Sequence, residues 1–240
     1  FTVIVTSILI AVLKQSNWQF IPIIWAIVPF VNIFNFLHVP IVEQPEEEKT
    51  ETLFSLFKSA DFLRFAVFMI CAGASEIAMA EWASLFAQQA LGVSKVTGDL
   101  LGPCAFAVCM GSGRVLFGFL DGKFSPRNAL IANNILCIIC YILVGVCNIP
   151  AFSLIACALC GFSVSLSWPG TYSMAAKYFP HGGTLMFSVL ALSGDLGCSI
   201  GPWLLGAVAD RFSLHSGFLV CSVFPLIMVI TALTLKKEKS

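Results

Sequence analysis

Long apolar runs alternate with short polar breaks along the whole chain. Each full run is close to the roughly 20 residues that a helix needs to cross the hydrocarbon core of a bilayer. The full runs cover residues 19–39, 62–87, 99–120, 128–148, 151–176, 184–207 and 215–235, and residues 1–13 resemble the end of another. The pattern predicts an all-α, polytopic membrane protein with one partial and seven full transmembrane helices.

The longest polar segment, residues 40–60, divides the apolar runs into two groups. It carries a run of glutamates around residues 43–51, and its block Thr52 to Phe57 has the pattern of a short amphipathic helix that lies on the membrane. We therefore expect residues 1–39 to end an N-terminal bundle, residues 40–60 to form a cytoplasmic linker, and residues 61–240 to form a C-terminal six-helix bundle. Because the chain starts at Phe1 inside an apolar run, we expect a fragment that lacks most of its N-terminal bundle.

Composition narrows the class of protein further. Hydrophobic residues make up 58% of the 240 and charged residues 11%, and the formal net charge is zero. This balance suits a lipid bilayer rather than a soluble core, and the lack of a basic patch argues against nucleic-acid binding. Ten cysteines lie in apolar runs without nearby histidines, so we interpret them as small hydrophobic residues. We expect no metal and no cofactor.

Lys and Arg residues in the breaks predict the orientation of the helices. Alternate breaks collect nine of the 13, and the other side holds three (Lys14, Lys95 and Arg211). Since positively charged loops stay on the cytoplasmic side, we expect a cytoplasmic C-terminus and location in the plasma membrane.

Two acidic residues, Glu76 and Asp195, stand deep inside apolar runs. A charged group at this depth costs at least about 2–3 kcal/mol, so it usually faces a partner or a water-filled cavity. Glu76 is a candidate proton carrier or acceptor for a solute hydroxyl, and the alternative is an acid held by a neighbouring helix. For Asp195 a functional and a structural role stay equally open. Glu81, nearer the end of its run, fits contact with headgroups or water.

Several stretches carry a resemblance to a known family. Residues 113–123 with Arg127 resemble the signature of the major facilitator superfamily at the cytoplasmic loop between helices eight and nine. Residues 168–171 with 177–180, and residues 194–202, resemble its tenth and eleventh helices. Residues 73–76 and Trp82 add a similarity to the fucose-permease-like sugar branch. The resemblance covers essentially the whole chain, as the end of helix five through helix twelve.

The resemblance implies a conformational loop motif in this chain, formed by Gly113, Arg114, Gly118, Asp121, Lys123 and Arg127. Asp121 stands three residues after Gly118, whereas the family signature places its aspartate four residues after the second glycine. For Arg114 we expect a local snorkelling or loop-anchoring role rather than contact with substrate.

The family also implies a binding site near the membrane midplane between two bundles. Aromatic faces suit sugar rings and amides suit hydroxyl groups, so the candidate binding residues are Trp168, Trp82, Asn133 and Asn134. Trp82 also fits an interfacial belt. Gly111, Gly118 and Gly122 share one face of a helix, as do Gly194, Gly197 and Gly201, and Pro169, Pro202 and Pro225 lie inside runs. Such residues permit close packing and bending.

We therefore expect a secondary active transporter of a small polar solute, most readily a sugar, with protons as the coupling ion in a symport. An efflux antiporter of another organic solute and a non-transporting sensor on the same scaffold are the alternatives. A membrane-embedded enzyme using Glu76 and Glu81 is disfavoured, because the three histidines stand at run ends and no hydrolase motif is present. We expect no enzymatic activity.

Overall fold

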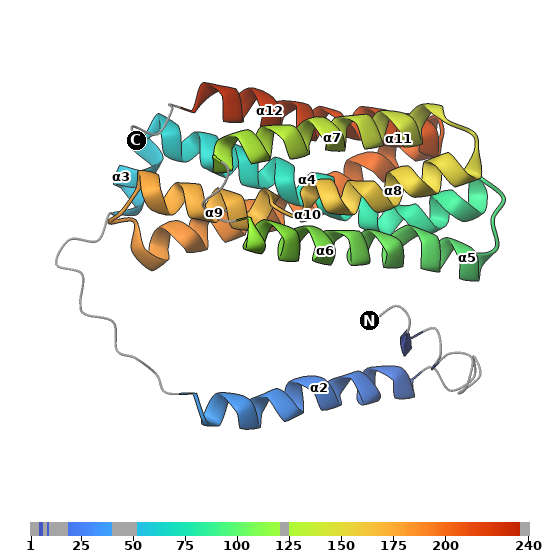
Figure 1. Cartoon of the computed structure of the whole chain (residues 1–240), viewed down its shortest axis with the longest axis horizontal. Coiled ribbons are helices and arrows are strands. Elements are labelled where there is room, and N and C mark those ends of the chain that lie inside the picture. Colours follow the sequence, from blue (N-terminus) through green and yellow to red (C-terminus); the bar gives the residue numbers. More distant parts are fainter. Residues whose placement is uncertain (1–4, 7–8, 10–18, 40–51, 121–124, 236–240) are drawn as a thin grey trace. The chain divides into compact units, whose positions relative to one another are not determined.

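Helices make up nearly all the regular structure of this protein (Figure 1). The computed structural model describes residues 5–6, 9, 19–39, 52–120 and 125–235. These residues contain no strand, which confirms the all-α prediction. The chain divides into two units, Phe1–Glu48 and Lys49–Ser240.

Among the described residues, seven helical segments are long and apolar enough to cross a membrane, and they match the seven full predicted runs. They are Phe20–Leu37, Ala60–Gln89, Lys95–Phe119, Pro126–Val146, Pro150–Tyr178, Gly183–Arg211 and Leu214–Thr234. The predicted partial run at residues 1–13 lies largely outside the described residues. In the first unit, α2 (Phe20–Leu37) contains Pro29 without a break, and the indole Nε1 of Trp25 donates to Thr6 Oγ1 at 3.0 Å.

The second unit contains the remaining helices, and several of its spans consist of more than one helix. In chain order they are α3 (Leu53–Lys58), α4 (Ala60–Gln89), α5 (Lys95–Asp99), the π-helix η2 (Leu100–Cys104), α6 (Ala105–Phe119), α7 (Pro126–Val146), α8 (Pro150–Val164), α9 (Ser167–Tyr178), α10 (Gly183–Arg211), α11 (Leu214–Cys221) and α12 (Val223–Thr234). The short helix predicted within residues 40–60 is α3, and the hydroxyl of Thr52 caps it by accepting from Ser55 N–H.

Prolines explain why three spans are interrupted. Proline has no N–H to donate and its ring clashes with the carbonyl four residues earlier. Pro169 accordingly follows the break between α8 and α9, and Pro225 follows the break between α11 and α12. Pro103 lies in η2, where the helix widens to π geometry. Pro202, in contrast, leaves α10 uninterrupted from Gly183 to Arg211.

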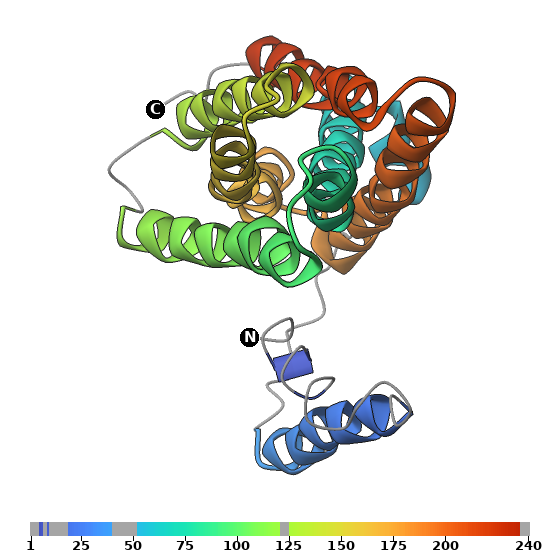
Figure 2. The same cartoon turned by 90° about the vertical axis from the view of Figure 1, so that its right-hand side faces the viewer.

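Helix α4 is the centre of the second unit. It packs against α10 and α12 and contacts α8, η2 and α9 (Figures 1 and 2). Its buried side chains include Phe62, Phe65, Phe68 and Phe86. The hydroxyl of Tyr141 on α7 donates to the carbonyl of Ser75 on α4 at 2.6 Å, and its ring is fully buried. The backbone beside Glu76 is thus fixed by a neighbouring helix.

The contact between α4 and α10 is a seam of glycines, which we call the glycine seam and define by Gly73, Gly194, Gly197 and Gly201. A Cβ atom on Gly197 would overlap the carbonyl of Ile70, and one on Gly201 would overlap the carbonyl of Ala74. The two backbones approach this closely only because glycine lacks a side chain. The predicted glycine stripe on α10 therefore serves helix packing.

Candidate functional site

An open pocket of about 320 Å³ brings the deepest acidic residue together with side chains from two other helices. Its lining residues are Glu76 of α4, Arg114 of α6, and Trp168, Pro169 and Tyr172 of α9. We call this space the acid pocket. It combines one carboxyl group, one guanidinium and two aromatic rings, a set of groups that can orient a small polar ligand.

The break before α9 determines which residues reach the acid pocket. Trp168 and Pro169 stand in the first turn of α9, and Tyr172 follows one turn later on the same face. The Trp168 ring lies against Gly194 of the glycine seam, where a Cβ atom would overlap it. Trp168 and Tyr172 form an edge contact with centroids 6.3 Å apart. The two rings form one aromatic wall.

Several polar groups of the acid pocket have no protein partner. Within the described residues, Glu76 Oε2 and Trp168 Nε1 are buried and make no hydrogen bond. The guanidinium of Arg114 likewise has no hydrogen bond or ion pair with any described residue, although it is close enough to Glu76 for their charges to interact. A buried polar group without a partner costs free energy, so Glu76 Oε2 and Trp168 Nε1 are suited to a ligand, a proton or water. Arg114 is exposed, and its guanidinium is open to a ligand on the same wall.

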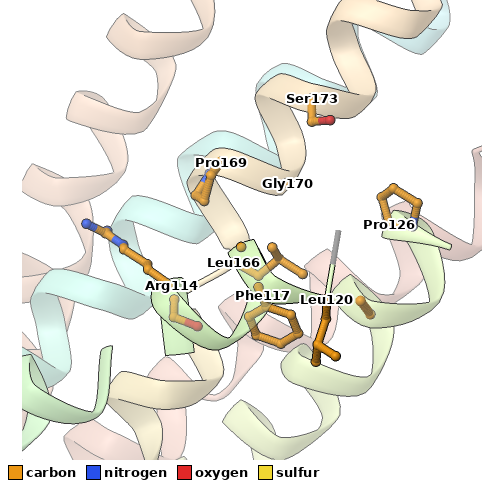
Figure 3. A pocket seen from close by; sticks show the side chains of 11 residues that line it. Arg114, Phe117, Leu120, Pro126, Leu166, Pro169, Gly170 and Ser173 are labelled. Carbon is orange, nitrogen blue, oxygen red and sulfur yellow. The ribbon is translucent and has the colours of Figure 1, made fainter. Parts of the chain in front are cut away.

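A second cavity adjoins the first and shares Arg114 and Pro169 with it. This larger space, about 390 Å³, lies between α6, α9 and the start of α7, and we call it the α6–α9 gap. Figure 3 shows Arg114 at one end of it and Pro126 at the other, with Phe117, Leu120 and Leu166 between them. The two cavities together lead from Glu76 to the end of the bundle where α6 stops and α7 starts.

Asp195, the second predicted acidic residue, stands on α10 with an exposed side chain. Its charge interacts with Tyr172 of the acid pocket, and Cys198 interacts with both Asp195 and Glu76. The Tyr172 ring also meets Phe187 of α10, with centroids 5.7 Å apart. Asp195 therefore lies within electrostatic range of the pocket but does not line it.

Asn133 and Asn134 are buried in α7 and line neither cavity. Asn134 Nδ2 donates to the carbonyl of Leu130 at 2.8 Å. Asn133 Nδ2 and Asn134 Oδ1 have no partner among the described residues. One turn before Asn133, Ala129 lines the α6–α9 gap. Binding of solute by these amides stays a prediction.

Trp82 and Glu81 lie apart from the two cavities. The Trp82 ring packs on Gly206 of α10, where a Cβ atom would come within 2.9 Å of it. Glu81 is exposed, as expected for a group near the end of its span. In this bundle Trp82 extends the contact between α4 and α10, and any role in binding stays a prediction.

The predicted loop motif is described only in part, because Asp121 and Lys123 lie outside the described residues. Gly113 packs on Ser165 at the break between α8 and α9, whereas Gly118 has open space and lines the α6–α9 gap. Arg127 donates from Nε to the carbonyl of Ala232 at 2.8 Å and from an Nη to that of Leu233 at 2.7 Å. Arg127 thus satisfies carbonyls that the end of α12 leaves free.

Two residues of the acid pocket were absent from the predicted binding set. For Arg114 we expected snorkelling or loop anchoring, but the structure places it on the wall shared by both cavities. Because Arg114 belongs to the family signature at the loop, the sequence predicted a role in the loop rather than in binding. Tyr172 had no distinct signal beyond its position four residues after Trp168, which is one helical turn. That spacing was the clue available in the sequence.

No metal centre emerges from the described part of the chain, where no three His, Cys, Asp or Glu residues form a group suited to a metal ion. The paired C-x-x-C spacings on α7 and α8 bring Cys137 Sγ to 3.8 Å from Cys160 Sγ in a fully buried position. These thiols occupy the interior as small side chains.

Comparisons with known proteins identify the family and the fold. The family model of the Major Facilitator Superfamily matches residues 1–184 and also residues 104–240. Two solved structures share the fold: the MFS transporter FucP in the outward conformation, with TM-score 0.73 and 17% identity, and a substituted form of the E. coli fucose:proton symporter FucP, with TM-score 0.74 and 16% identity. Each match covers 91% of this chain and 54% of the other, so the chain spans about half the length of these structures. No curated protein sequence matches.

Proposed function

The chain belongs to the Major Facilitator Superfamily, and from this we propose that it forms part of a secondary active transporter that carries a small polar solute together with a proton. Glu76 is the proton carrier in this proposal. The observation that carries it is a buried, unpartnered carboxyl oxygen on the wall of a cavity inside a membrane-spanning helix bundle. Intramembrane acids that face a cavity are typical of proton relays.

The domain organisation of the proposal follows the two groups of spans. Residues 1–39 end a first bundle, residues 40–60 link the bundles on the cytoplasmic side, and residues 61–240 form the second bundle. In transporters of this kind the substrate binds between two bundles that rock around it. The acid pocket is then the half of the binding site that the second bundle contributes. The C-terminus lies in the cytoplasm and the protein resides in the plasma membrane.

In this proposal, protonation of Glu76 in the acid pocket controls transport. A carboxylate at Glu76 is held in place by its charge, because moving it across the bilayer interior is costly. Protonation makes the side chain neutral, and the bundles can then close around it and the solute. Release of the proton on the other side restores the charged state. The gap between α6 and α9 gives Glu76 a path to one end of the bundle.

A sugar is the solute that best suits the aromatic wall. The faces of Trp168 and Tyr172 match the C–H faces of a sugar ring, and the unpartnered Trp168 Nε1 can donate to a hydroxyl. The fold similarity to a structure named as a fucose:proton symporter supports the same choice.

Uptake by the full-length protein in proteoliposomes tests the proposal. A panel of labelled hexoses, deoxyhexoses and other polar solutes is offered with and without an inward proton gradient. We expect gradient-driven accumulation of at least one solute. Glu76→Gln should abolish accumulation and keep exchange of solute across the membrane, because exchange requires no net proton movement.

Glu81→Gln is the matched control, since Glu81 is an exposed acid on the same helix. It should accumulate solute like the wild type. Accumulation by Glu76→Gln at the wild-type level would contradict the role of Glu76. Solute movement driven outward by the proton gradient would instead indicate an efflux antiporter.

A further inference from the structure

The acid pocket also indicates which kind of polar solute it takes. We propose that the solute carries a carboxylate next to its hydroxyl groups, as a sugar acid does, and that Arg114 binds this carboxylate. The inference rests on the proposed function, since it names the substrate class of the same site. It starts from the one cationic group on the wall of the pocket.

The position of Arg114 argues against a purely anchoring role. It is an exposed residue five positions before the end of α6, inside a membrane-spanning segment where a guanidinium that faces lipid is costly. In Figure 3 its side chain extends away from Phe117 and Leu120, the residues toward the end of α6. It reaches the pocket that holds Glu76 and Trp168. A snorkelling arginine would extend in the opposite direction, toward the helix end.

The guanidinium has the chemistry to recognise a carboxylate. Its planar fork of N–H donors matches the two oxygens of a carboxylate in a bidentate geometry. Among the described residues nothing occupies these donors, and no ion pair within 4 Å joins Arg114 to Glu76. With a neutral sugar in the pocket and Glu76 protonated, Arg114 would have no anion beside it. A sugar acid would supply that anion and keep the hydroxyls for the aromatic wall.

The charges around Glu76 connect anion binding to the proton. Glu76 faces Arg114 of α6 and Tyr172 of α9, and Cys198 and Asp195 of α10 lie within electrostatic range of the pocket. An ionised Glu76 attracts Arg114 and repels a solute carboxylate, because like charges in one small pocket oppose each other. Binding of the anion to Arg114 therefore favours protonated Glu76. One proton and one anion then cross together, with no net charge moved.

Proteoliposomes with the full-length protein test the inference with labelled glucuronate and gluconate against glucose and fucose. We expect accumulation of the acids under an inward proton gradient, and no competition by a tenfold excess of the neutral sugars. Because the transported pair is neutral, a membrane potential set with valinomycin and potassium should leave the initial rate unchanged.

Variants identify the residue that binds the carboxylate. Arg114→Gln should lower uptake of the acid at least tenfold, and Arg114→Lys, which keeps the charge without the planar fork, should retain part of it. Arg211→Gln, at an exposed arginine outside both cavities, is the matched control and should match wild type. A monodisperse elution profile of each variant shows that it is folded. If Arg114→Gln does not fold, the reduced uptake expected of Arg114→Lys tests the role of Arg114.

The outcomes separate this inference from the proposed function. One outcome is proton-driven uptake of a neutral sugar, while the acids are neither transported nor able to compete. It would overturn the inference that the solute carries a carboxylate and leave the transporter proposal intact. Wild-type uptake of the acid by Arg114→Gln would overturn the role of Arg114. Failure of a folded protein to accumulate either kind of solute would overturn both proposals.

Discussion

The second unit contains two contacts between helices that differ sharply in packing. At the glycine seam, α4 and α10 approach so closely that a Cβ atom on Gly73, Gly197 or Gly201 would overlap a backbone carbonyl. At the α6–α9 gap, the helices separate and leave a cavity of about 390 Å³ beside the acid pocket. Both regions are rich in glycine and apolar residues, so composition alone does not distinguish them.

The difference follows from where the glycines point and where prolines interrupt the helices. On α10, Gly194, Gly197 and Gly201 all face α4 or the Trp168 ring. On α6, Gly111 and Gly118 have open space around them. The break before Pro169 turns α9 so that its first residues line a cavity. The seam holds Glu76 and Trp168 in fixed positions, and the gap leaves room for a solute and for motion.

A methyl group placed in the glycine seam should have the largest effect. Gly197→Ala puts a Cβ atom on the carbonyl of Ile70, which belongs to a helix backbone and cannot rotate away. We expect a loss of about 3 kcal/mol in the free energy of unfolding, typical of an overpacked interior. The loss is detected as a lower thermal midpoint, measured by size-exclusion chromatography after heating.

Gly111→Ala is the control for the seam, because a Cβ atom there meets nothing within 4 Å. It should keep or raise the midpoint, since alanine suits a helix interior better than glycine. Equal midpoints for the two variants would show that the seam is not closely packed.

Removal of the aromatic wall should have the second-largest effect. Trp168→Ala deletes the ring that lies between Gly194 and the acid pocket, and we expect solute affinity to fall about 30-fold, or about 2 kcal/mol. Equilibrium binding of the labelled solute measures it. Trp203→Ala, at a ring that is 70% exposed on the same bundle, should bind like wild type. A similar loss in both variants would point to general destabilisation.

The link between Arg127 and α12 should contribute less. Arg127→Gln removes the charged donor to the carbonyls of Ala232 and Leu233 while keeping a polar side chain. We expect a loss of about 1 kcal/mol in stability, as for a partly exposed cation at a helix C-terminus. Chemical denaturation in detergent measures it, and Lys95→Gln, at an exposed lysine that starts α5, should show no loss. An unchanged Arg127→Gln would mean that water replaces the guanidinium without cost.

Filling the α6–α9 gap should have the smallest effect, and it should act on rate rather than stability. Gly118→Leu places a side chain into the gap without meeting any atom within 4 Å of its Cβ. We expect the transport rate to fall about threefold, or about 0.6 kcal/mol in barrier height, at an unchanged thermal midpoint. Gly111→Leu, two turns earlier on the same face but outside the gap, should transport normally. A rate unchanged by Gly118→Leu would indicate that the gap takes no part in transport.

The sequence predicted the spans well, because twenty apolar residues in a row have few other uses. It also singled out Glu76, since an acid inside such a run is costly and therefore conspicuous. It could not place Arg114, because the direction of a long side chain depends on helices far away in the chain. Nor could it separate Trp168, on the pocket, from Trp82, against Gly206: both are tryptophans in apolar runs, and only the packing of α9 and α10 distinguishes them.

The proline breaks give three spans an internal joint. Helix α9 has 12 residues, so it is about 18 Å long, and a tilt of about 10° at its start would carry its far end by about 3 Å. That is roughly the width of a water molecule. A small rotation at one joint would therefore open or close a passage for water at the far end of α9, while α8 keeps its contacts with α6 and α7. In such a bundle, wetting and drying of the passage can be controlled by half a helix, and the central α4 need not move.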